Sequence, residues 1–145
     1  MVKLGRHDDA LRLGEETLAL YKRTQPDHPD IATSMNNLAS TYSDLGRHDD
    51  ALRLKEETLA LRKRILPSDH PDIPKSMSNL AMVYSKLGRH DDALRLMKET
   101  LAFKKRILPS DHPDIAMSMN NLAETYSDLG RHNDALRLKE ETLTL

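Results

Sequence analysis

The sequence predicts an all-α solenoid, because one unit recurs along the chain and its apolar residues follow helical spacing. The unit is marked by the stretch Gly-Arg-His-Asp-Asp-Ala-Leu-Arg-Leu, which begins at Gly5, Gly46, Gly88 and, with one substitution, Gly130. Segments 46–87 and 88–129 agree at 32 of 42 positions. Self-similarity at a period of roughly 20 to 50 residues is typical of proteins whose units pack only against their neighbours.

The first predicted helix spans 8–23, where apolar residues recur every three or four positions and Lys22 and Arg23 suit the negative end of the helix dipole. Residues 3–5 match 86–88, so we expect them to end a preceding helix whose body lies outside the sequence. Proline at 26 and again at 29 separates this helix from the next one.

Each later unit is expected to contain a first helix, A, and a second helix, B. Helix B carries two apolar stripes, for example Leu54 with Leu61 and Leu52 with Leu59, which predicts packing on its own A helix and on the next. Together these segments predict about seven antiparallel helices and no strand. The expected A and B helices span 29–45 with 49–66, 71–87 with 91–108, and 113–129 with a last, truncated helix from 133.

Glycine is expected to end each A helix, because only glycine enters the left-handed conformation without steric cost. Arg89, which follows Gly88, is expected to be solvated. The whole chain is interpreted as a single solenoid domain, 1–145. Its parts are a half repeat at 1–27, repeat one at 28–69, repeat two at 70–111 and a truncated repeat three at 112–145.

Composition disfavours several classes of function. The chain has 22 basic and 23 acidic residues, a net charge of −1, so no global field attracts nucleic acid or an anionic membrane. It has no cysteine, which excludes disulfides and thiolate chemistry. No apolar run approaches the length of about 18 residues that a membrane span requires. We therefore expect a cytoplasmic protein without nucleic-acid or membrane partners.

None of the sequence motifs indicates a catalytic or metal-binding site. The seven histidines fall into two repeated classes, after Gly-Arg and before Pro-Asp, and both lie at helix starts. No pair has the i, i+4 spacing of a helical zinc site, so capping and linker geometry is the favoured interpretation. The acidic pairs also recur in every unit, whereas an enzyme needs one unique constellation. The sequence predicts no catalytic residue, metal site or cofactor, and no enzyme activity.

The spacing of Leu38-Ala39, Tyr42, Gly46 and Ala51 resembles the tetratricopeptide repeat. A longer unit with His-Pro-Asp before helix A and Asn-Asn-Leu-Ala within it is similar to the kinesin-light-chain type. The resemblance implies a right-handed superhelix that binds other proteins. The chain departs from the family pattern at His48, Lys55 and Thr58.

The resemblance also implies a concave groove lined by the A helices. Positions where repeats two and three differ fall among its residues, including Met82 with Glu124 and Lys86 with Asp128. The asparagines could grip an extended peptide backbone, or they could only bond neighbouring helices. The expected groove residues are Asn36, Asn37, Ser40, Asp44, Lys75, Asn79, Met82, Lys86, Asn120, Asn121, Glu124 and Asp128.

The sequence predicts two alternative functions. The first is a protein-interaction scaffold that binds a peptide or a helix in the groove, with Lys75 and Lys86 favouring an acidic ligand. The second is a structural or self-associating segment, a sensor or spacer, of a larger receptor-type or motor-associated protein. The outward stripes of the first and last helices also predict weak end-to-end self-association.

Overall fold

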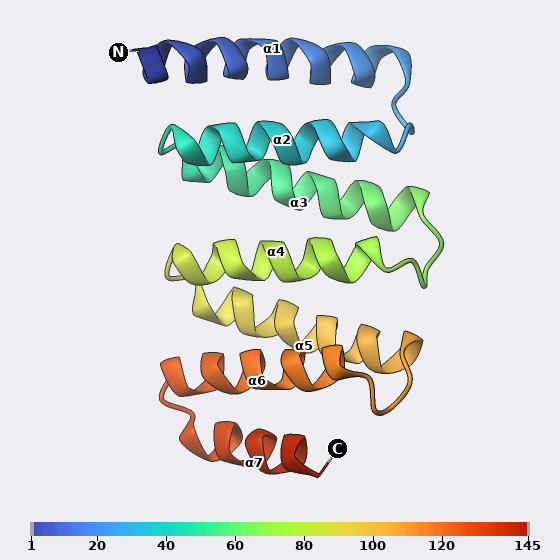
Figure 1. The fold of residues 1–145 in the computed structure, drawn as a ribbon, viewed down its shortest axis with the longest axis vertical. Helices are drawn as coiled ribbons and strands as arrows, with labels where there is room; N and C mark the ends of the chain where they lie inside the picture. Colours follow the sequence, from blue (N-terminus) through green and yellow to red (C-terminus); the bar gives the residue numbers. More distant parts are fainter. Residues whose placement is uncertain (1, 145) are drawn as a thin grey trace. The chain divides into compact units, whose positions relative to one another are not determined.

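The computed structural model describes the backbone of residues 2–144 and the side chains of residues 6–144. Over this range the chain forms seven α-helices and no strand, as the repeat pattern predicts (Figure 1). The helices are α1 (Val2–Thr24), α2 (Asp30–Asp44), α3 (His48–Ile65), α4 (Asp72–Lys86), α5 (His90–Ile107), α6 (Pro113–Asp128) and α7 (His132–Leu143).

The chain divides into two compact units, residues 1–73 and residues 74–145. In the first unit α2 packs against both α1 and α3, and in the second α6 packs against both α5 and α7. Consecutive helices within a unit run antiparallel (Figure 1). The unit boundary falls in the first turn of α4, close to the expected start of repeat two. The division of the sequence into one half repeat and three further repeats remains a prediction.

The helix bounds from α2 to α7 agree with the sequence prediction to within one or two residues. The predicted start of the first helix was wrong, because α1 begins at Val2 and runs without a break through Gly5, whereas its predicted end at 23 agrees to within one residue. In later copies the arginine after the glycine donates its N–H to a tyrosine carbonyl, as Arg47 does to Tyr42 at 2.8 Å. At Gly5 the helix continues, because glycine permits a left-handed turn without requiring one.

Glycine ends the A helices as expected. Gly46, Gly88 and Gly130 have φ of 77°, 77° and 75°, in the left-handed region. The chain then reverses within two residues, and the N–H of Arg89 closes the turn on the carbonyl of Tyr84 at 2.8 Å. This repeated cap sets where each B helix begins and therefore which of its stripes meets helix A.

The core of the first unit is built around α2. Its buried Ile31 and Leu38 lie among Leu18 of α1 and Leu54 and Leu61 of α3. In the second unit the other B-helix stripe is used: Leu94 and Leu101 of α5 pack with Ile115, Met119 and Leu122 of α6. One stripe thus contacts the helix A of its own repeat and the other contacts the next, which confirms the predicted pair of partners.

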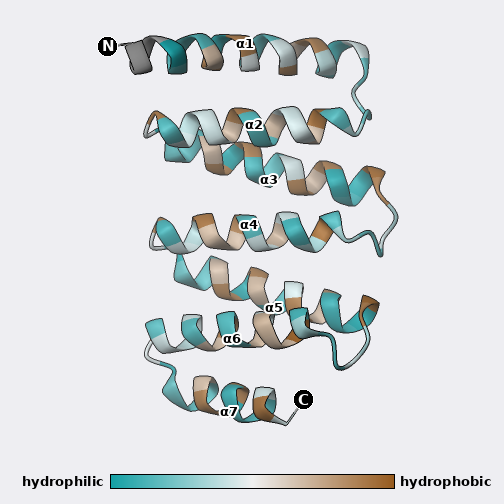
Figure 2. Ribbon diagram, in the orientation of Figure 1, coloured by the Kyte–Doolittle hydropathy of each residue, from teal (hydrophilic) through white to brown (hydrophobic). Residues whose placement is uncertain are grey.

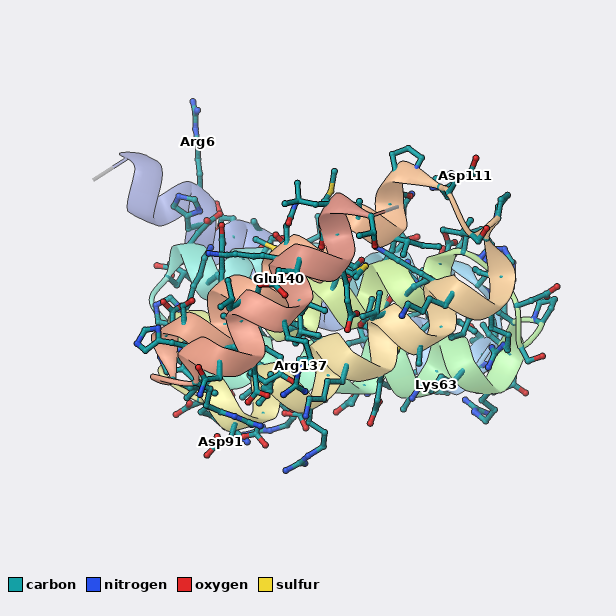
Figure 3. All side chains as sticks on the ribbon, turned by 90° about the horizontal axis from the view of Figure 1, so that it is seen from below. Arg6, Lys63, Asp91, Asp111, Arg137 and Glu140 are labelled. Atoms are coloured by element: carbon teal, nitrogen blue, oxygen red, sulfur yellow. The ribbon has the colours of Figure 1, made fainter. Side chains whose placement is uncertain are left out.

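The polar residues cover the outside. Each helix carries hydrophobic and hydrophilic residues along its whole length (Figure 2), as expected for helices buried on one side only. The side chains of Arg6, Asp91 and Asp111 extend away from the ribbon (Figure 3), and all three are exposed. Within each unit the buried apolar stripes supply the packing between helices.

Candidate functional site

The predicted groove residues lie on one exposed stripe of each A helix, which we call the A-helix face. Asn36 is half-exposed, and the other eleven are exposed. In the first unit the stripe belongs to α2 alone. In the second unit α4 and α6 each contribute one. These stripes are Asn36, Asn37, Ser40 and Asp44 on α2, Lys75, Asn79, Met82 and Lys86 on α4, and Asn120, Asn121, Glu124 and Asp128 on α6.

Within the second unit the two stripes border a hollow of about 70 Å³. We call it the methionine hollow, because the side chains of Met82 and Met97 lie on it and no other large apolar side chain does. Two of the predicted residues, Met82 and Asn121, are brought together here. The full lining consists of Ser78, Ala81 and Met82 of α4, Met97 and Thr100 of α5, and Ser118 and Asn121 of α6.

Sequence reasoning missed Met97, which belongs to a B helix. Met97 is half-buried, and its sulfur accepts a hydrogen bond from the Thr125 hydroxyl at 3.0 Å. A signal was present, because the copies disagree at this position: Lys55 and Lys139 stand one repeat before and after it. Disagreement between copies therefore marks this position on helix B, as it marks Met82 on helix A.

Charged residues also lie on the helices that line the hollow. Lys75 and Lys86 lie on α4, and Glu124 and Asp128 lie on α6, all exposed. In the described part of the chain none of these four has an ion-pair partner. A fifth charge comes from α5, where Lys104 Nζ donates to Ser118 Oγ at 3.0 Å.

The repeated asparagines do not hold helices together. The main-chain oxygen of Asn37 accepts a hydrogen bond from the Thr41 hydroxyl at 3.2 Å. The main-chain oxygen of Asn121 lies 3.1 Å from the Thr125 hydroxyl, whose single proton it shares with the sulfur of Met97. Among residues 6–144 the side-chain amides of Asn37, Asn79 and Asn121 make no hydrogen bond to a neighbouring helix. Each amide therefore keeps its donors and its acceptor for solvent or a ligand.

A family model decides the classification. The model described as tetratricopeptide repeat matches residues 2–64, 31–106 and 72–145, which together cover nearly the whole chain. The chain belongs to the tetratricopeptide repeat family. No curated protein sequence matches it.

Solved structures of tetratricopeptide-like proteins share the fold. A kinesin-light-chain-like protein of Podosopora anserina with nearly identical TPR-like repeats is 29% identical, with a TM-score of 0.78, over 98% of this chain and 68% of that one. BtubC (BKLC) from P. vanneervenii is 21% identical, with a TM-score of 0.80, over 97% and 56%. A Rap protein complexed with Competence and Sporulation Factor is 14% identical, with a TM-score of 0.70, over 96% and 37%. The last two likenesses concern the fold alone.

The histidines before Pro-Asp cap the tetratricopeptide A helices. His112 Nδ1 accepts the N–H of Asp114 at 3.1 Å, and His28 and His70 make the matching bonds at 3.1 and 3.0 Å. Of the histidines after Gly-Arg, His48, His90 and His132 instead form the first residue of a B helix. The prediction of a helix start is wrong for His7, because α1 runs through it. Among the described side chains no three His, Asp or Glu residues are placed to hold a metal ion together.

The arginine of Gly-Arg-His-Asp-Asp is not simply solvated, which corrects the prediction for Arg89. Its guanidinium carbon lies 4.7 Å from the centre of the Tyr84 ring, and its Nε donates to Asp92 Oδ2 at 2.9 Å. Arg47 and Arg131 make the same pair of contacts. The motif therefore joins the end of helix A to the start of helix B.

A charged residue of helix B also contacts the tyrosine of the next A helix. In the first unit Tyr42 donates its hydroxyl to Glu15 Oε2 at 3.2 Å, and burial, together with this carboxylate, raises the pKa of Tyr42. In the second unit the Lys98 ammonium lies 5.5 Å from the centre of the Tyr126 ring. The half repeat and repeat two thus use different chemistry at one shared position.

No helix in the described part of the chain combines the length and the apolarity that crossing a membrane requires.

Proposed function

We propose that this chain is a protein-interaction scaffold that binds a peptide or a helix on its A-helix face. Tetratricopeptide folds are typical of such scaffolds, and solenoids of this kind generally bind along the surface formed by successive repeats. The observation that carries the proposal is the methionine hollow, where apolar side chains and the unpaired amide of Asn121 lie beside each other. A few polar groups around an apolar concavity are the usual composition of a binding site.

Three further considerations support this proposal. The Rap protein, which shares the fold, was solved with Competence and Sporulation Factor bound. Tetratricopeptide proteins and the neighbours above have non-enzymatic scaffold folds, so we propose no catalytic role and no cofactor. The near-neutral net charge gives no reason to invoke nucleic acid, and we propose a cytoplasmic location.

The proposal is tested by selecting ligands from a random peptide library displayed on phage, with the purified chain as bait. The selected peptides are then titrated against a Lys75→Glu, Lys86→Glu double variant. If the peptides are acidic, we expect weaker binding and a smaller dependence on salt, because both lysines lie on the A-helix face. The matched control is Lys63→Glu, Lys105→Glu, which makes the same charge change on exposed positions of α3 and α5.

The proposal would be contradicted if the Lys75→Glu, Lys86→Glu variant kept its affinity for the peptides while the control variant lost it. The binding surface would then lie on the B helices. Failure to select any peptide that binds the folded chain would also count against it.

A second function, a structural or self-associating segment of a larger protein, is favoured by a separate observation. Large apolar side chains are exposed on α1 and α7, the helices at the two ends of the sequence. Leu13 and Leu20 of α1 are 64% and 51% exposed, and Leu136 and Leu143 of α7 are 56% and 88% exposed. Surfaces of this kind favour contact with another repeat or another copy.

A further inference from the structure

We infer that a pocket between α1, α2 and α3 binds a leucine-containing segment of a partner protein. None of the residues that line this pocket belongs to the A-helix face, so the site is separate from the one proposed above. Three observations carry the inference: the lining of the pocket, the leucine that packs at the matching place in the second unit, and the residue that replaces this leucine in the first.

The pocket lies within the first unit and has a volume of about 440 Å³. We call it the α1–α3 pocket. The buried side chains of Ile31 and Met35 of α2 form its apolar base. Pro26, which lies in the linker after α1, and Leu61 of α3 also line it. A concavity of roughly 300 to 1,000 Å³ with a largely apolar lining is the usual setting of a ligand site.

In the second unit a leucine packs at the start of the corresponding helix A. Ile115 and Met119 of α6 match Ile31 and Met35 of α2 in the repeat. Leu108, which directly follows α5, is half-buried and packs against the core cluster that contains Ile115 and Met119. The chain itself therefore shows which class of side chain suits this place.

In the first unit Gln25 stands where Leu108 stands in the second. Gln25 directly follows α1, and its N–H donates to the Tyr21 carbonyl at 2.7 Å. The N–H of Leu108 makes the matching bond to the Lys104 carbonyl at 2.9 Å. The side chain of Gln25 is polar and exposed, so the aliphatic group that covers the start of α6 has no counterpart at the start of α2.

The linker after α1 is also shorter. Three residues separate the end of α1 from His28, whereas four separate the end of α5 from His112. The carbonyl of Gln25 accepts the N–H of His28 at 3.1 Å, a bond that Pro109 makes to His112 at 3.0 Å in the longer linker. Gln25 thus takes the backbone roles of both Leu108 and Pro109, and the pocket stays open beside it.

Two exposed ion pairs connect α3 to the α1 side of the pocket. Lys22 Nζ lies 3.3 Å from Glu57 Oε2, and Arg64 Nη1 lies 2.6 Å from Asp27 Oδ1. Exposed pairs of this kind contribute little free energy, so they can rearrange around a ligand. Since both cations of the lining already have a carboxylate partner, the ligand is identified by its aliphatic group and not by a charge.

The space is larger than one leucine side chain, so it has room for the residues that flank the leucine. In the second unit the leucine follows isoleucine and precedes proline, in the segment Ile-Leu-Pro-Ser at 107–110. These aliphatic side chains gain free energy on leaving water and leave no polar group without a partner. The same segment therefore serves as a model of the partner.

The test adds this segment, as a peptide with both ends blocked, to the full chain with carbon-13-labelled isoleucine and methionine methyl groups. We expect the methyl resonances of Ile31 and Met35 to move with a common dissociation constant. Those of Ile115 and Met119 should stay in place, because Leu108 already packs there. Replacing the leucine of the peptide by alanine should weaken binding roughly tenfold or more, given the usual gain from burying such a side chain.

Two variants at one position separate filling of the pocket from other effects. Gln25→Leu introduces the residue found at the matching place in later copies and should abolish peptide binding, because the chain then fills the pocket itself. It should also raise the urea midpoint of unfolding. Gln25→Ala truncates the same side chain without filling the pocket and should keep the affinity of the original chain.

Equal affinities for the leucine and alanine peptides, or binding that survives Gln25→Leu, would overturn the inference. Shifts of Ile115 and Met119 with Ile31 and Met35 unmoved would do the same. Shifts of Ile31 and Met35 that appear when the chain is concentrated without peptide would identify a second copy as the occupant and would contradict the assignment to a partner protein.

Discussion

Gly88 and Arg89 are neighbours that stabilise the end of α4 in different ways. Gly88 has φ of 77°, and no atom lies within 4 Å of the place where a Cβ would be built, so backbone conformation alone makes glycine necessary. We expect Gly88→Val to cost at least about 1–2 kcal/mol of the free energy of unfolding, because a branched residue is strained there. Arg89→Ala should cost less, since its ring and carboxylate contacts are exposed. Equal losses in urea midpoint would contradict this account of the cap.

The raised pKa of Tyr42 makes the stability of the folded chain depend on pH in the alkaline range. Its raised pKa means that the unfolded chain ionises near the ordinary value of about 10, while the folded chain ionises only at higher pH. The folded state then retains the proton longer, so its stability is complete below about pH 10 and falls as the pH rises through the folded pKa. We expect Tyr42→Phe to reduce this alkaline loss, measured as urea midpoints across that range. The same alkaline loss in both proteins would contradict the assignment.

At the scale of the element, histidine caps set the starts of the A helices. His112→Ala removes the acceptor for the Asp114 N–H and should destabilise the chain by about 0.5–2 kcal/mol, whereas His112→Asn should restore most of the loss. The matched control is His132→Ala at the start of α7, where the side chain caps nothing. Thermal unfolding of the three variants provides the comparison. Equal effects at His112 and His132 would show that the cap contributes little.

Element bounds were predictable where the sequence contains both ends of a helix and the contacts that stop it. From α2 to α7, glycine and proline mark the ends, and apolar spacing indicates the buried face. At the start of α1 the glycine signal was misleading, because α1 runs through Gly5 and glycine permits a helix end without requiring one. The A-helix face remains a prediction that the family resemblance implies, and disagreement between copies only marks positions within it. Met97 and Lys104 were not predicted, because they reach the hollow from α5 and only the packed unit brings them beside α4 and α6.

At the scale of the whole molecule, the exposed leucines of α1 and α7 predict weak association between copies. We expect monomers in dilute solution and larger species at millimolar concentration, because a few exposed leucines bury too little apolar area for a stable dimer. Replacing Leu136 and Leu143 by Glu should abolish the effect, whereas Asn79→Ala on α4 should not. Light scattering across this concentration range is the measurement. A chain that remains monomeric throughout would count against self-association.

The central claim is that ligands bind the A-helix face, and the side-chain amide resonances of asparagine test it most directly. These groups lie on α2, α4 and α6 and have no partner of their own on neighbouring helices in the described chain. A peptide selected from the library is titrated into nitrogen-15-labelled protein. We predict that the amide groups of Asn79 and Asn121 shift together and saturate at one dissociation constant. Saturating shifts on the outer faces of α5 and α7, with Asn79 and Asn121 unmoved, would contradict the claim.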